Sequence, residues 1–259
     1  MTVARSVCGL RIECGAATPK AAGARPHIET VCCMTSIPPA ENLDQIAART
    51  LAHYDQRALA YWEGTRDHDV SQNIAALLQA IATPAPLAIL DFGCGPGRDL
   101  DTFTRLGHVA TGLEGSPRLA AMARAASGCD VLQQNFFALD LPASHFDGVF
   151  ANAALFHVPS RVLPRVLKEL HATLKPGGVL FSSNPRGHGQ EGWSGERYAV
   201  FHDLQGWRVH MTAAGFTELA HYYRPPGLPF EQQPWLATLF KAELRPQPHT
   251  ASAPPPPRR

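Results

Sequence analysis

The chain has 259 residues, a length that predicts one domain with room for a small additional element. Hydrophobic residues make up 45% and charged residues 17%, which predicts a sizeable core and excludes a wholly disordered chain. The net charge is +1, yet residues 34–244 carry 16 basic and 20 acidic groups without a run of Lys or Arg, so we expect no nucleic-acid partner.

Residues 1–33 contain four of the six cysteines and show no sustained helical or strand period. No cysteine there has a His partner at zinc-ligand spacing, and six are too few for a disulfide framework. We therefore expect no metal site and a reducing compartment, the cytoplasm. The segment lacks the apolar stretch of a secretory signal. We expect a disordered N-terminal extension before an alternative start at Met34, with a weak organellar targeting segment as the alternative.

Helical and strand patterns alternate through residues 34–244, which we expect to form the folded domain. Apolar residues at helical spacing predict helices over 41–62 and 69–82, before an apolar run at 87–90 that predicts the first strand. Beyond it we expect helices that end near 106 and that cover 117–126, 161–173 and 203–214, and strands over 108–113, 130–133, 146–151, 179–183 and 216–224. This alternation is typical of an α/β domain with a mostly parallel sheet and helices on both faces.

Two further features exclude other classes. No apolar run approaches the roughly 18 residues of a membrane helix, so we expect no membrane span. Residues 245–259 contain six prolines and are predicted to be a disordered tail.

A glycine-rich turn follows the first predicted strand, in the sequence LAILDFGCGPGRD at 87–99. Gly93, Gly95 and Gly97 permit positive φ and let a ligand approach the backbone. A dinucleotide fingerprint that begins at Gly93 would need glycine where the chain has Arg98, and no Gly-Lys-Ser/Thr follows for a Walker loop. The next strand ends at Glu114, whose carboxylate can accept hydrogen bonds from both hydroxyls of an adenosine ribose.

DFGCGPG at 91–97, Glu114 and LKPGG at 174–178, in this order, make residues 45–240 resemble a class I S-adenosylmethionine-dependent methyltransferase. The resemblance implies a Rossmann-like α/β fold with a doubly wound, mostly parallel seven-stranded sheet and an N-terminal helical cap. It also implies S-adenosylmethionine as cofactor. The cofactor-binding residues that it implies are Asp91, Gly93, Gly95, Gly97, Glu114, Asn135, Phe136 and Asn152.

The resemblance also distributes roles among these residues. The glycines would face the methionine part, Asp91 would order their loop and Glu114 would hold the ribose. Asn135 and Phe136 would flank adenine, with Asn135 in place of the common Asp, and Asn152 would lie below the sulfonium. Purely structural interpretations stay open: a tight strand–helix turn for the glycines, a solvated strand end for Glu114 and an ordinary turn for Asn135.

The acceptor is expected to be a small molecule. Amino-methyltransferases that act on nucleic acids carry an Asn/Asp/Ser-Pro-Pro-Tyr/Phe signature after the fourth strand, where this chain reads ANAA at 151–154. Five longer stretches, at 54–78, 92–116, 148–158, 181–198 and 221–237, resemble the methyltransferase domain of ovothiol synthesis. That resemblance implies N-methylation of the imidazole of 5-thiohistidine. The chain has no room for a sulfoxide synthase module, so we expect a separate one in the same pathway.

Residues for such an acceptor are found mainly in the segment 184–198, which follows the fifth strand at the ligand-binding edge of the sheet. Arg186 or Arg197 could hold a carboxylate, and Glu196 or Asp69 an ammonium group. The remaining substrate-binding candidates are Asn184 and the aromatic residues Trp193, Tyr198 and Phe156, which could stack on the ring.

The catalytic candidates are Tyr54 in the cap and His157, which could accept the ring proton; a buried structural histidine is the alternative interpretation. Other hypotheses remain. The acceptor could be another small phenol, carboxylate or thiol, or the chain could be a non-catalytic partner protein that binds S-adenosylmethionine. A dinucleotide oxidoreductase is disfavoured by Arg98.

Overall fold

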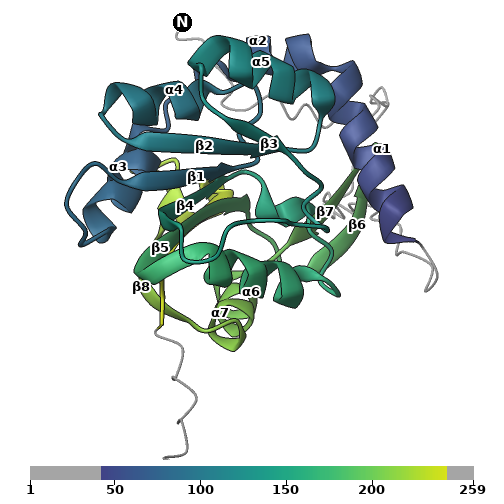
Figure 1. Cartoon of the computed structure of the whole chain (residues 1–259). Coiled ribbons are helices and arrows are strands. Elements are labelled where there is room, and N and C mark those ends of the chain that lie inside the picture. The colour runs from purple at the N-terminus through teal and green to yellow at the C-terminus, as the bar shows by residue number, and fades with distance from the viewer. Residues whose placement is uncertain (1–41, 244–259) are drawn as a thin grey trace, which may run out of the picture.

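The computed structural model describes residues 42–243, so the predicted ends at 1–33 and 245–259 lie outside the described residues. A seven-stranded sheet with the order β3-β2-β1-β4-β5-β9-β8 forms the centre of the molecule (Figure 1). Its strands are β1 (Ala88–Phe92), β2 (Val109–Glu114), β3 (Val131–Gln133), β4 (Phe146–Asn152), β5 (Leu174–Pro185), β8 (Phe216–Arg224) and β9 (Trp235–Ala242). Strands β1 to β5 pair in parallel, whereas β9 runs antiparallel to both β5 and β8. The predicted Rossmann-like fold is confirmed.

Helices cover both faces of the sheet. They are α1 (Leu43–Gln56), α2 (Ala58–Thr65), α3 (Ser71–Ala80), α4 (Arg98–Arg105), α5 (Pro117–Ser127), α6 (Leu163–Thr173) and α7 (Leu204–Ala213). Leu90 and Phe92 of β1 belong to the core that includes α6 and α7, and Ile89 belongs to the core that includes α3, α4 and α5. Alternating side chains of a strand point to opposite faces, so a strand between two helical layers must be apolar throughout. The apolar run at 87–90 shows this pattern.

Three expectations about individual elements were wrong. The predicted helix 41–62 is two helices, because Arg57 leaves the helical region with φ −109° and ψ 16°. Strand β9 was not predicted, although it lies inside the sheet between β5 and β8. The segment 184–198, for which no strand was predicted, contains most of a hairpin formed by β6 (Gln190–Ser194) and β7 (Arg197–Phe201).

Helix α1 extends from this hairpin to the start of α5, across the carboxyl edge of the parallel strands. Near the middle of α1, Thr50 Oγ1 accepts a hydrogen bond of 3.0 Å from the Tyr198 amide of β7. Near the C-terminal end of α1, Asp55 accepts from the Ser116 hydroxyl at 2.8 Å and the Arg118 amide at 2.9 Å. Within residues 42–243, no helix combines the length and apolarity of a membrane span.

Candidate active site

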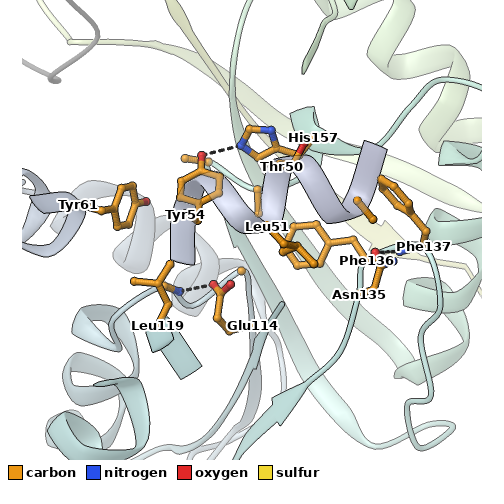
Figure 2. A pocket seen from close by; sticks show the side chains of 15 residues that line it. Thr50, Leu51, Tyr54, Tyr61, Glu114, Leu119, Asn135, Phe136, Phe137 and His157 are labelled. Atoms are coloured by element: carbon orange, nitrogen blue, oxygen red, sulfur yellow. Dashed lines mark hydrogen bonds between the residues drawn. The ribbon is translucent and has the colours of Figure 1, made fainter. Parts of the chain in front are cut away.

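A cleft of about 590 Å³, partly open to solvent, lies at the carboxyl ends of β1, β2 and β4 (Figure 2). This is the edge at which open α/β sheets bind ligands. The lining residues are Ala47, Thr50, Leu51, Tyr54, Tyr61, Gly93, Gly95, Glu114, Leu119, Asn135, Phe136, Phe137, Ala153, Ala154 and His157.

The glycine turn forms one wall of the cleft. Gly93 has φ +77°, and a Cβ there would lie 2.6 Å from the Ala154 Cβ. Gly97 has φ +92° and precedes α4 as its N-cap, where a Cβ would lie 2.8 Å from the Ala123 Cα. The turn itself therefore requires glycine at both positions, in agreement with the interpretation of these residues as a tight strand–helix turn. Gly93 and Gly95 also line the cleft, whereas Gly97 does not.

Glu114 joins the end of β2 to this turn. Its carboxylate accepts hydrogen bonds from the Gly95 amide at 3.0 Å and from the Ser116 amide at 2.8 Å. The residue is 7% exposed, so its interpretation as a solvated strand end is wrong. Burial raises the pKa of Glu114, and the backbone amides oppose that shift. A carboxylate has about four acceptor positions, so two backbone donors leave capacity for the hydroxyls of a ligand.

Asp91 lies behind the turn and does not line the cleft. It is 2% exposed, and its Oδ2 has no hydrogen-bond partner among the described residues. Burial, and next the neighbouring Asp99, raise the pKa of Asp91 well above its usual value. Asp99 is itself paired with Arg98 at 2.7 Å.

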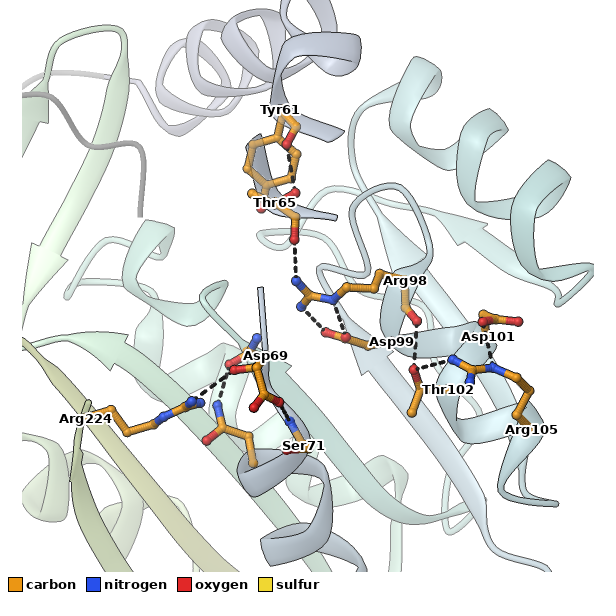
Figure 3. Close-up of polar contacts among 12 residues, drawn as sticks. Tyr61, Thr65, Asp69, Ser71, Arg98, Asp99, Asp101, Thr102, Arg105 and Arg224 are labelled. Carbon is orange, nitrogen blue, oxygen red and sulfur yellow. Dashed lines mark hydrogen bonds and ion pairs between the residues drawn. The ribbon is translucent and has the colours of Figure 1, made fainter. Parts of the chain in front are cut away.

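Arg98 connects the turn to the cap. Its guanidinium donates to the Thr65 carbonyl at 2.8 Å, and Arg224 of β8 donates to the Asp69 carbonyl at 3.0 Å (Figure 3). These two hydrogen bonds fix both ends of the segment that connects α2 to α3. The side chain of Asp69 accepts from the Ser71 amide at the start of α3 and is exposed, outside the residues that line the cleft.

The two residues expected beside adenine line the cleft, whereas the residue expected below the sulfonium does not. Asn135 and Phe136 line the cleft, and Phe136 stacks on Phe92 with ring centroids 4.3 Å apart. The Asn135 Oδ1 accepts from the Phe137 amide at 3.0 Å, which is the turn-forming role that the alternative interpretation gave it. Asn152 does not line the cleft, and its Oδ1 accepts from Asn73 of α3 at 3.0 Å.

The two catalytic candidates, Tyr54 and His157, contact each other at the opposite side of the cleft (Figure 2). The Tyr54 Oη lies 2.8 Å from the His157 Nε2, and the His157 Nδ1 lies 2.6 Å from the Tyr198 carbonyl oxygen. Burial lowers the pKa of His157 to about 3, so the ring is neutral. Because both ring nitrogens are bonded, His157 can act on an acceptor only through Tyr54.

The two candidate arginines occupy different environments. Arg197 is partly buried and donates to the Tyr54 Oη at 3.3 Å, beside the cleft. Arg186 donates to the backbone carbonyls of Gln233, at 2.6 Å, and of Phe230, and its guanidinium stacks on the Phe230 ring at 3.6 Å. Arg186 therefore anchors the segment before β9 and does not line the cleft.

The remaining acceptor candidates lie in and around the hairpin. Tyr198 is fully buried and its hydroxyl donates to Glu191 at 2.6 Å, so its ring offers no face for stacking on a ligand. The Trp193 ring lies 4.2 Å from the guanidinium of Arg49, which pairs with Glu196 at 2.7 Å. These contacts attach the hairpin to α1.

Asn184 and Phe156 lie behind His157. The Asn184 Oδ1 accepts from the Phe156 amide at 3.2 Å, and both residues line a second, smaller cavity of about 260 Å³. Among residues 42–243, no group of three or more His, Cys, Asp or Glu side chains could hold a metal ion.

Residues of the cap were missed by the sequence analysis. Tyr61, Leu51 and Thr50 line the cleft together with Tyr54. Tyr54 lies in α1 and Tyr61 in α2, so spacing along one continuous helix was no signal for their contact. Their rings meet edge to face, with centroids 5.4 Å apart.

Part of the chain is similar to known methyltransferases. Residues 90–182 match the family described as "Methyltransferase domain". The chain is 31% identical to malonyl-[acyl-carrier protein] O-methyltransferase of Erwinia pyrifoliae over 62% of this chain and 59% of that protein. It is 35% identical to ubiquinone biosynthesis O-methyltransferase of Xanthomonas axonopodis pv. citri over 39% of this chain and 44% of that protein. The chain thus spans less than two thirds of the length of these relatives.

Among solved structures, the 1,6-didemethyltoxoflavin-N1-methyltransferase of Burkholderia thailandensis, with bound 1,6-didemethyltoxoflavin and S-adenosylhomocysteine, is similar with a TM-score of 0.67. It is 21% identical, over 80% of this chain and 93% of that one. Residues 90–182 thus resemble a methyltransferase domain, and the fold is similar to that of this methyltransferase structure. These similarities agree with the broad family resemblance stated from the sequence.

Proposed function

We propose that this chain, with its methyltransferase domain and class I fold, is an enzyme that transfers a methyl group from S-adenosylmethionine to a small molecule. The observation that carries the proposal is the cleft that joins Gly93, Gly95 and Glu114 on one side to Tyr54 and His157 on the other. Cofactor and acceptor can therefore lie next to each other in one cleft, which is the arrangement that direct group transfer requires.

The residues of the cleft fit the cofactor. A Cβ at Gly93 would already clash with Ala154, so the turn keeps its backbone bare at the wall of the cleft. Glu114 is held by two backbone amides at a fixed position and retains acceptor capacity for a ribose diol. The bound cofactor supplies an activated methyl group on a sulfonium, so the chain needs only to align the acceptor and manage one proton.

For the acceptor, we propose the imidazole of 5-thiohistidine, in a pathway that includes a separate sulfoxide synthase. The proposal is supported by the five stretches of sequence that resemble the methyltransferase domain of ovothiol synthesis. One of these stretches begins with Tyr54, and another ends with Val158, just after His157. Arg197 is a cation next to Tyr54 that could attract an amino-acid carboxylate. Cys94 and Cys129 are free thiols, which is in keeping with the reducing compartment that we propose, the cytoplasm.

The decisive experiment measures S-adenosylhomocysteine release by the full chain with 5-thiohistidine, histidine and a phenol in parallel. We expect turnover of 5-thiohistidine above the other two. Turnover of the phenol alone would retain the methyltransferase proposal and remove the ovothiol assignment. Absence of cofactor binding in calorimetry would contradict the methyltransferase proposal itself.

A further inference from the structure

The Tyr54 hydroxyl has a fixed hydrogen-bond polarity. A backbone carbonyl can only accept, so the 2.6 Å contact between the His157 Nδ1 and the Tyr198 carbonyl requires a proton on Nδ1. A neutral imidazole then has a lone pair on Nε2, and the 2.8 Å contact with Tyr54 requires that the hydroxyl donates to it. The Arg197 guanidinium, a pure donor, approaches the same oxygen at 3.3 Å and is consistent with this direction.

On this basis we propose that Tyr54 accepts and never donates in the cleft, so that the methyl acceptor must present an N–H or O–H to it, and a carboxylate acceptor is disfavoured. The inference rests on the proposed function and narrows its substrate class. Of the acceptors left open by the sequence, an imidazole and a phenol carry such a hydrogen. An ionised carboxylate carries none and would meet lone pairs of the Tyr54 oxygen.

The same contacts give the proton a route. In the transfer, a methyl–nitrogen or methyl–oxygen bond forms while the methyl–sulfur bond breaks, and its electron pair stays on sulfur. The acceptor's N–H or O–H proton passes to the Tyr54 oxygen, and the Tyr54 proton passes to the His157 Nε2. The products are the methylated acceptor, the neutral thioether, a restored Tyr54 and an imidazolium that still donates from Nδ1 to the Tyr198 carbonyl.

The surroundings of His157 explain why it returns the proton. Burial, and next the charges of Arg197 and His53, disfavour its charged form and lower its pKa. The imidazolium therefore loses its proton readily in this position, and His157 reverts to the neutral ring after turnover. Tyr54 is a catalytic residue in this scheme, whereas His157 acts through it and is a positioning and proton-accepting residue.

The polarity itself is tested by ¹⁵N NMR of the histidine rings in the full chain with S-adenosylhomocysteine at pH 7, with His157→Gln to assign the signal. We expect a neutral ring with its proton on Nδ1. A proton on Nε2, or a charged ring, would overturn the proposal. This readout needs no acceptor, so it remains decisive even if no acceptor is turned over and the proposed function fails.

The chemical consequence is tested with catechol, 5-thiohistidine and benzoate as acceptors. Methylation of benzoate at a rate comparable with the other two would overturn the proposal while leaving the methyltransferase function intact. Tyr54→Phe is expected to lower kcat about a hundredfold, the lower end of acid–base contributions, with unchanged affinity for S-adenosylhomocysteine. Tyr223→Phe, on β8 outside the cleft, is the matched control and should retain full activity.

His157→Gln separates orientation from proton acceptance. Its amide could donate to the Tyr198 carbonyl and accept from Tyr54, but it cannot take up a proton. We expect kcat to fall while the KM of the acceptor stays near that of the wild type. A wild-type kcat in both Tyr54→Phe and His157→Gln, with their melting temperatures retained, would overturn the proton route.

Discussion

The two sides of the cleft are built in different ways. The proposed cofactor side comes from the turn after β1 together with Glu114 at the end of the neighbouring strand β2. The acceptor side joins α1, the segment after β4 and the hairpin β6–β7, which brings Tyr54 to His157 across 103 residues of sequence. One side is thus fixed by backbone geometry, and the other by side-chain contacts between distant elements.

This difference predicts unequal tolerance to substitution. On the cofactor side, a Cβ added at Gly93 or Gly97 would force the backbone to move, because both glycines have positive φ and close neighbours. On the acceptor side, the polar contacts of Arg49, Thr50 and Tyr54 each attach α1 to the hairpin or to His157. We expect substitutions on the cofactor side to have all-or-none effects and substitutions on the acceptor side to have graded effects.

The largest effect is expected for Gly93→Ala. The new Cβ would lie 2.6 Å from the Ala154 Cβ at φ +77°, so the turn must move and the cofactor wall with it. We expect affinity for S-adenosylhomocysteine to fall at least a hundredfold, with a loss of about 1–3 kcal/mol in the free energy of unfolding. Gly64→Ala in α2 is the control, because no atom lies within 4 Å of its Cβ, and it should leave both quantities near wild type. Equal affinities in the two variants would contradict the backbone argument.

Next in size is Glu114→Ala. The change removes the acceptor for the ribose hydroxyls and also the partner of the Gly95 and Ser116 amides. At about 1.5–3 kcal/mol for a hydrogen bond to a charged group, calorimetry should show cofactor affinity about 10- to 100-fold weaker. Glu218→Ala on β8, which loses an ion pair with Arg208 outside the cleft, should leave the affinity unchanged. An unaffected Glu114→Ala would remove this residue from the site.

The same difference explains what the sequence could and could not predict. The run 87–99 carries its strand, its turn and the start of its helix in consecutive residues, so the local pattern was sufficient to predict these elements. Strand β9 enters the sheet out of chain order, between β5 and β8, and no local pattern specifies that insertion. Its apolar stretch from Leu236 to Phe240 was nevertheless a strand signal.

For the acceptor side, the sequence predicted candidate residues but not the residues that they contact in the fold. Arg186 and Arg197 flank the same segment and looked equivalent, yet the hairpin directs one toward Tyr54, and the other binds the carbonyls of Phe230 and Gln233. The hairpin itself had a signal in Gly195, whose φ of +62° forms the turn between β6 and β7. Which side chains it would bury, such as Tyr198, depended on the position of α1.

A pH effect tests the burial of the acceptor side. The unperturbed pKa of His is about 6.5, and the folded protein lowers the pKa of His157 to about 3. Between these values the unfolded chain binds a proton that the folded chain does not, so stability is full above pH 6.5 and falls as pH decreases. From pH 6.5 to 5 we expect the wild type to lose about 2 kcal/mol more than His157→Gln in denaturant unfolding. Parallel losses in the two proteins would mean that His157 is protonated in the folded state.

The smallest effect separates the two arginines. If Arg197 binds an anionic group of the acceptor, Arg197→Ala should raise the acceptor KM about tenfold, the equivalent of about 1.5 kcal/mol for one charge-assisted contact, with cofactor affinity unchanged. Arg186→Ala should instead lower the melting temperature without changing KM, because its guanidinium is bonded to two backbone carbonyls and stacked on Phe230. Arg197→Lys should restore part of the loss, since a point charge replaces the planar fork. A raised KM in Arg186→Ala with a wild-type Arg197→Ala would reverse the assignment and place the anion-binding group next to β9.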